Sequence, residues 1–240
     1  MFLTVNFKKF LFGFLLAAIV AFAITFVLLF SEKGDTTVSS FAEQEAPILV
    51  IDPGHGGEDG GAVSVCGTPE SGINLDISLR MEALADFMGL PCVLTREGNA
   101  IDYPKEANTA ARRKVYDQKA RIKLINETPN AVLISVHQNC FPHRAPRGPQ
   151  TFYAKTEGSS DLAILVQSIM NTAIYPENRR IATPVARNIY LMKNISCPAV
   201  LAECGFLSNP EEAKLLESES YRLKIAAALL CGYLQFLDDY

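Results

Sequence analysis

Short apolar segments alternate with amphipathic segments along most of the chain. Apolar runs predict strands over residues 48–51, 92–94, 132–136, 151–153, 189–192 and 199–202. Helical patterns lie between them, over residues 73–88, 109–125 and 161–172, and two further helices are expected to begin at Pro210 and Tyr221. This alternation is typical of βαβ units. We therefore expect an α/β fold: a single three-layer domain with a largely parallel central sheet flanked by helices.

The first 46 residues follow a different pattern. Residues 1–9 end in the pair Lys8 and Lys9, residues 10–30 are uncharged and almost wholly apolar, and residues 31–46 are polar without periodicity. An apolar run of about 20 residues crosses a bilayer as a helix, and basic residues before it place the following chain outside the cytoplasm. We expect a cytoplasmic N-terminus (1–9), a transmembrane anchor (10–30), a polar linker (31–46) and an extracytoplasmic domain (47–240). The alternative is a cleaved signal peptide, whose apolar region is usually shorter.

Composition narrows the functional classes. The 240 residues are 49% hydrophobic and 20% charged, which is typical of a globular domain. The net charge is −4 and the basic residues are scattered, so we expect no nucleic-acid partner. The six cysteines show no C-x-x-C spacing, which argues against a cysteine-only zinc site or a thioredoxin-type centre. We expect free thiols, because a small buried thiol is the commoner state beside apolar runs.

Three predicted strands end in residues that can bind a metal or move a proton. "ILVIDPGH" leads to His55, "AVLISVH" ends at His137, and "AVLAE" ends at Glu203. The carboxyl ends of parallel strands meet at one edge of a sheet, where open α/β proteins bind their ligands. Two histidines and carboxylates at one place suit a catalytic zinc, which takes three protein ligands and leaves a position for water.

Spacing alone leaves the third ligand open. The candidates are the carboxylates near these strand ends, namely Glu58, Asp59, Glu70 and Glu203. Each histidine on its own could also be a hydrogen-bonded structural residue. The third histidine of the chain, His143, lies in a proline-rich loop and is expected to be exposed.

Two other kinds of site fit the sequence poorly. The glycine-rich stretch after the first strand has no G-K-[ST], and Asp59 stands where a dinucleotide-binding loop needs its third glycine. A serine nucleophile would require G-x-S-x-G, which is absent, and Cys204 is interpreted as a small packing residue behind Glu203. We therefore favour the metal site over phosphate binding or covalent catalysis.

Five motifs resemble those of the zinc-dependent N-acetylmuramoyl-L-alanine amidases of the Amidase_3 type. They are "IDPGHGGEDGGA", "PESGINLDISLR", "LTRE", "ISVHQN" and "AECGFLSNPEEAKLL", in this order. The resemblance implies a peptidoglycan substrate, cut between muramic acid and L-alanine. It also implies Zn²⁺ as the cofactor, with His55, Glu70 and His137 as metal ligands and Glu203 as the catalytic acid and base.

The chain departs modestly from this family and is similar to one branch of it. Gln138 and Cys140 stand where many members have alanine, and we expect them to alter substrate contacts rather than metal binding. The short chain without wall-binding repeats is similar to the germination-specific amidases of spore cortex. That similarity implies a partner deacetylase in muramic δ-lactam formation, or an activator protein. The alternative function is a non-catalytic domain of the same fold that binds peptidoglycan or recruits another enzyme.

Overall fold

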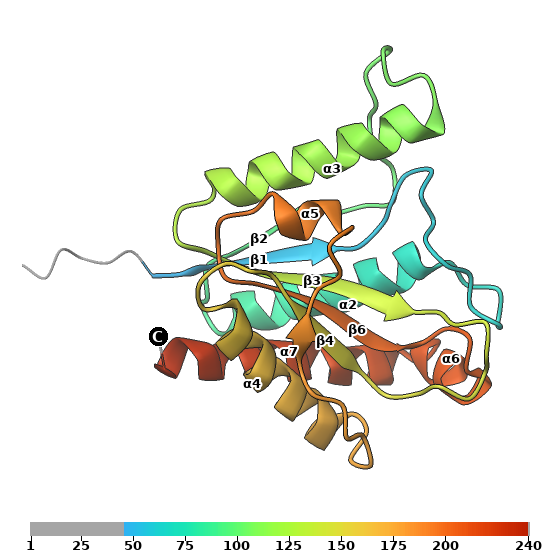
Figure 1. The fold of residues 1–240 in the computed structure, drawn as a ribbon, viewed down its shortest axis with the longest axis vertical. Helices are drawn as coiled ribbons and strands as arrows, with labels where there is room; N and C mark the ends of the chain where they lie inside the picture. The colour runs from blue at the N-terminus through green and yellow to red at the C-terminus, as the bar shows by residue number, and fades with distance from the viewer. Residues whose placement is uncertain (1–45, 240) are drawn as a thin grey trace, which may run out of the picture. The chain divides into compact units, whose positions relative to one another are not determined.

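The computed structural model describes residues 46–239, which form an α/β domain around a six-stranded sheet (Figure 1). The strand order is β2-β1-β3-β6-β4-β5. The strands are β1 (Ile48–Pro53), β2 (Cys92–Leu94), β3 (Ala131–Asn139), β4 (Gln150–Tyr153), β5 (Thr183–Pro184) and β6 (Ala199–Phe206). The helices are α2 (Glu70–Phe87), α3 (Ala110–Glu127), α4 (Ser159–Ala173), α5 (Tyr190–Lys193), α6 (Pro210–Leu216) and α7 (Glu219–Asp239).

The sheet is mixed: four of its five strand pairings are parallel, which agrees with the expectation of a largely parallel sheet, and one is antiparallel. The pairs β1–β2, β1–β3, β3–β6 and β4–β5 are parallel, whereas β4 pairs antiparallel with β6. The connection from β3 to β4, over residues 140–149, contains no helix. A parallel strand needs a crossover connection, usually helical, so β4 returns in the opposite direction.

The expected three layers are confirmed. Helices α2, α4 and α7 cover one face of the sheet, and α3 with α5 lies over the other (Figure 1). Alternate residues of a strand point to opposite faces. In β1, Leu49 and Ile51 accordingly join the first core cluster, whereas Val50 packs with Ile125 of α3 and Leu191 of α5 in the second.

Two elements differ from the sequence-based expectation. Residues 189–192 were expected as a strand, but they lead into the short helix α5, in which Leu191 and Met192 are buried. A four-residue apolar run has no periodicity that separates a buried strand from a buried helical turn. The two-residue strand β5 was not expected, because it is too short to leave a pattern.

The expected anchor and nearly all of the expected linker lie outside the described residues. Within residues 46–239, no helix is long and apolar enough to cross a membrane. The anchor at residues 10–30 therefore stays a prediction.

Candidate active site

The strand ends that carry chemistry meet at one edge of the sheet. His137 of β3 is the register partner of Glu203 in β6, and Pro53 of β1 is paired with Val136. His55 follows β1 by two residues, so it reaches the same edge. Glu70 comes from another direction, as the first residue of α2.

Glycines allow the loop after β1 to lie against the other site residues. A Cβ atom on Gly54 would lie 2.3 Å from Nε2 of His137, and one on Gly61 would lie 2.6 Å from Oε2 of Glu70. Real Cβ atoms do not approach so closely. Gly54 and Gly61 are therefore explained by packing against the side chains of the site.

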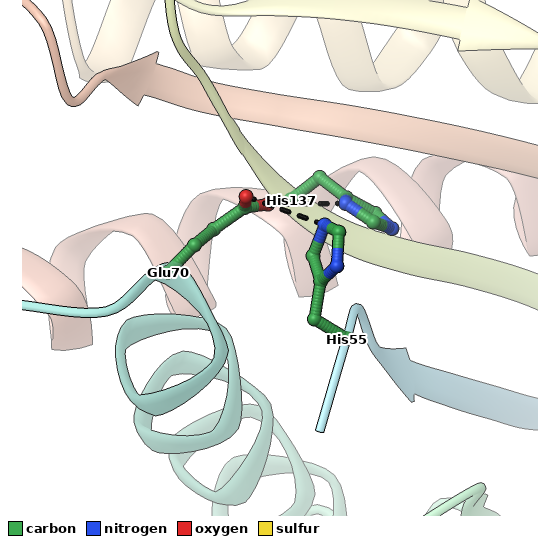
Figure 2. Close-up of side chains that lie close together, drawn as sticks. All are labelled: His55, Glu70 and His137. Carbon is green, nitrogen blue, oxygen red and sulfur yellow. Dashed lines mark hydrogen bonds and ion pairs between the residues drawn. The ribbon is translucent and has the colours of Figure 1, made fainter. Parts of the chain in front are cut away.

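His55, Glu70 and His137 form a compact group (Figure 2). Nε2 of His55 lies 3.3 Å from Oε2 of Glu70, and Nδ1 of His137 lies 3.1 Å from Oε1 of the same carboxylate. One donor atom from each residue lies within 4.8 Å of the others. The donor set, two imidazole nitrogens and a carboxylate oxygen, is one that a divalent metal ion accepts.

Glu70 is held rigidly by its surroundings. Its Oε1 accepts hydrogen bonds from the backbone N–H of Gln138 at 3.0 Å and from Nδ2 of Asn74 at 3.2 Å, and its Oε2 accepts one from the N–H of Ala62 at 3.1 Å. Burial alone would raise the pKa of Glu70, but the bonds to His137 and to the other histidine hold it far below its usual range. The carboxylate is therefore charged and oriented toward the two imidazoles.

The other carboxylates near the strand ends occupy different places. Asp59 lies 3.1 Å from Nδ1 of His55, the ring nitrogen that does not face Glu70, and its second oxygen pairs with Lys114 at 2.9 Å. Glu58 instead pairs with Arg113. The structure thus groups Glu70 with the histidines, and it places Asp59 behind one of them. His143 is exposed, as expected.

Glu203 is placed differently from Glu70. Its Oε2 atom is buried and has no hydrogen-bond partner among the described residues. Burial raises the pKa of Glu203 to about 7, although His137 acts in the opposite direction. A carboxyl group with a pKa near neutrality can accept and release a proton at physiological pH, as a general acid–base catalyst requires.

An open cleft of about 510 Å³ leads to these residues. One wall comes from α3, through Lys114 and Gln118, and the other from residues 188–192. Gln138 and Cys140 also line the cleft. However, the Gln138 side chain is buried and donates from Nε2 to Asn74, so it also supports the residues around Glu70.

The cysteines take no part in the group. All six are free, as expected, but only Cys204 is buried, whereas Cys66, Cys140 and Cys231 are exposed. Burial raises the pKa of Cys204 far above its usual range, which leaves it a neutral packing residue behind the site.

Sequence patterns missed two buried arginines under the site. Arg96 and Arg121 donate hydrogen bonds to main-chain carbonyls of residues 53–55. Arg121 has no distinctive local signal, because it lies in a helix rich in charged residues. Arg96 belongs to the "LTRE" motif, which was the available signal for its importance.

Comparisons with known proteins agree with this geometry. Residues 49–233 match the Amidase_3 family, described as N-acetylmuramoyl-L-alanine amidase. The germination-specific N-acetylmuramoyl-L-alanine amidase of Bacillus subtilis is 34% identical over 193 residues, or 80% of each chain. The amidase LytC of the same organism is 27% identical, and the match spans 35% of its length.

Solved structures give the same result. The CwlD amidase of Clostridioides difficile, solved in complex with the GerS lipoprotein, superposes with a TM-score of 0.76 and 36% sequence identity. The match covers 81% of this chain and all of that one. An N-acetylmuramoyl-L-alanine amidase from Clostridium difficile 630 is 29% identical, with a TM-score of 0.69. The chain therefore belongs to the N-acetylmuramoyl-L-alanine amidase family.

Proposed function

We propose that this chain is a zinc-dependent N-acetylmuramoyl-L-alanine amidase in which His55, Glu70 and His137 hold the metal. The observation that carries the proposal is the compact His–Glu–His group at the end of the cleft. Its donor atoms match the catalytic zinc sites that use two histidines and one carboxylate and leave a position open. No cysteine lies in the group, so a soft metal site is not favoured.

The proposed chemistry divides between the metal and Glu203. A zinc ion at this site would polarise the carbonyl of the scissile amide and lower the pKa of a water molecule. Glu203 takes a proton from the attacking water and then gives it to the departing alanine nitrogen. Its pKa of about 7 supports both roles, because a group of that pKa can take up and release a proton near neutral pH. Its Oε2 has no hydrogen-bond partner among the described residues, so that atom is available to the reacting groups.

The alternative function is a non-catalytic domain that binds peptidoglycan or recruits a partner enzyme. Such a domain has no need for a buried acid with a perturbed pKa. The presence of Glu203 beside an intact His–Glu–His group favours catalysis over binding alone.

Product analysis tests the proposed activity. The zinc-loaded full-length chain should release stem peptides with a new free alanine amine and leave glycan with unsubstituted lactyl carboxyl groups. A glycosidase would instead create reducing ends, and an endopeptidase would cut within the peptide. Peptidoglycan that is bound but not cut would favour the non-catalytic alternative.

The proposed biological setting is spore cortex. The germination-specific relative and the amidase solved with a lipoprotein support a role in cortex maturation and a partner protein. We infer that the amidase acts before the δ-lactam ring closes, because the lactyl carboxyl can close onto the sugar nitrogen only after the peptide has left and a partner deacetylase has removed the acetyl group. Anchoring through residues 10–30 would keep the domain on the cell wall or spore cortex side. Protease added to intact protoplasts should then release the domain from its membrane stub, and a protected domain would contradict this topology.

A further inference from the structure

The metal-ligand candidate His55 has an unusual backbone conformation. Its φ angle is 62°, in the left-handed region that residues other than glycine rarely occupy. Such a conformation persists where the surrounding structure holds it, and it is common at functional sites. The groups that bind the backbone of His55 therefore decide where its imidazole lies.

A buried guanidinium from α3 binds this backbone. Arg121 donates from Nη2 to the carbonyl oxygen of His55 at 2.5 Å and from Nη1 to that of Pro53 at 2.7 Å. Its side chain is only 4% exposed. Arginine presents its donors in a rigid planar fork, so one side chain fixes the peptide groups on both sides of the turn.

Arg121 is itself held in place by two carboxylates. Its Nη1 pairs with Oδ1 of the buried Asp52 at 2.7 Å, and its Nε donates to Asp117 at 2.9 Å. Asp52 also accepts hydrogen bonds of 2.6 Å from the hydroxyls of Ser135 and Thr95. Burial raises the pKa of Asp52, but Arg121 and these hydroxyls outweigh it and lower the pKa to about 2. The ion pair is therefore charged, and its geometry is set by strands β1 and β3.

A second arginine shows how specific this contact is. Arg96 donates to the carbonyls of Pro53, Gly54 and Ser71, at 2.9, 3.0 and 2.8 Å, rather than to the carbonyl of His55. Arg96 thus supports the turn before His55, whereas Arg121 binds the peptide group of His55 itself.

We propose that Arg121, oriented by Asp52, is a positioning residue that holds His55 in the left-handed conformation needed for metal binding. The proposal rests on the proposed role of His55 as a metal ligand. It predicts that the exact shape of the guanidinium matters, and not only its charge. A lysine at this position would keep the charge next to Asp52 but could not bridge both carbonyls as a planar fork.

Metal titration of the full-length chain tests the proposal. Zn²⁺ affinity is measured by competition with a chromophoric chelator, and the ligand geometry is followed by the visible absorption of bound Co²⁺. Arg121→Lys should weaken Zn²⁺ binding by about 10- to 100-fold, the range typical for loss of an outer partner of a metal ligand. The Co²⁺ spectrum should change as well.

Arg112→Lys is the matched control. Arg112 lies on the same helix but is exposed, and it donates to the carbonyl of Glu106 and to Asn108 rather than to the turn that carries His55. We expect this variant to keep the Zn²⁺ affinity and the Co²⁺ spectrum of the wild type.

The outcomes separate the two proposals. A wild-type chain that binds no Zn²⁺ would contradict the proposed metal site itself. A wild type that binds Zn²⁺, together with an Arg121→Lys variant of equal affinity and unchanged Co²⁺ spectrum, would overturn the positioning role alone. An Arg121→Lys chain that does not fold would also overturn it, since Arg121 would then act on the stability of the whole domain.

Discussion

His137 and Glu203 stand directly opposite each other on the adjacent parallel strands β3 and β6. In a strand pair, side chains at the same register position point to the same face. His137 contacts Glu70, whereas Glu203 keeps a buried oxygen that has no hydrogen-bond partner within residues 46–239. This pairing places a candidate metal ligand beside a candidate proton carrier, and it suggests that the two residues respond differently to substitution.

Glu203→Gln should stop turnover without removing the metal. The amide has the size of the acid but cannot take up a proton, so turnover should fall at least roughly 10²-fold, the scale typical of losing a general base. The measurements are the rate of amide cleavage and the zinc content of the purified variant. If the zinc were lost as well, Glu203 would be a ligand rather than the base.

His137→Ala should abolish both tight zinc binding and activity. A catalytic zinc held by two protein ligands is poorly bound, so the loss of affinity should exceed the roughly 10- to 100-fold cost of losing an outer partner. The exposed His143 provides a control, since His143→Ala should leave zinc affinity unchanged. Equal zinc binding by the His137→Ala variant would contradict the ligand assignment.

Asp59 should contribute to metal affinity through His55. Its Oδ1 lies 3.1 Å from Nδ1 of His55, so it can accept a hydrogen bond from that nitrogen and leave Nε2 free to bind a metal. We expect Asp59→Ala to weaken zinc binding by about 10-fold in a chelator competition. Glu58→Ala is the matched control, because the adjacent Glu58 pairs with Arg113 and not with His55. Similar losses in both variants would indicate a general effect on the loop.

The sequence predicted the parts of the site that depend on strand periodicity. His55, His137 and Glu203 each end an apolar run, and parallel pairing of their strands brings them together. The carboxylate that joins the histidines was not determined by spacing, because Glu70 reaches the site from the start of α2. The resemblance to the amidases supplied that residue.

Long-range polar contacts were beyond prediction from the sequence. Arg121 reaches His55 across 66 positions of the chain, and nothing in its helix marks it as buried. The direction of β4 was missed for a related reason. The residues of β4 show only that the strand is apolar, and its direction depends on how the preceding loop returns the chain.

Stability of the metal-free chain should depend on pH through Glu203. Its pKa is raised from 4.5 to about 7 by burial, so the folded state binds the proton more tightly than the unfolded state does. The stabilising contribution of the neutral acid is complete below about pH 4.5 and is lost as the pH rises through about 7, by on the order of 1 kcal/mol per pH unit. Urea unfolding at several pH values should show this loss in the wild type. Glu203→Gln should lack it, and identical pH profiles for the two chains would contradict the raised pKa.

The cortex role predicts a specific chemical loss in a deletion strain. Muramic δ-lactam forms when the lactyl carboxyl closes onto the sugar nitrogen, which requires that both the stem peptide and the acetyl group have been removed. If this chain removes the peptide, its deletion should eliminate δ-lactam from spore cortex and leave vegetative wall unchanged, as measured by mass spectrometry of muropeptides. Complementation with the Glu203→Gln variant should fail to restore the lactam, because the variant keeps the fold and the metal ligands but not the proton carrier. Normal lactam in the deletion strain would contradict the cortex role while leaving the amidase chemistry intact, and restoration by the Glu203→Gln variant would point to the non-catalytic alternative.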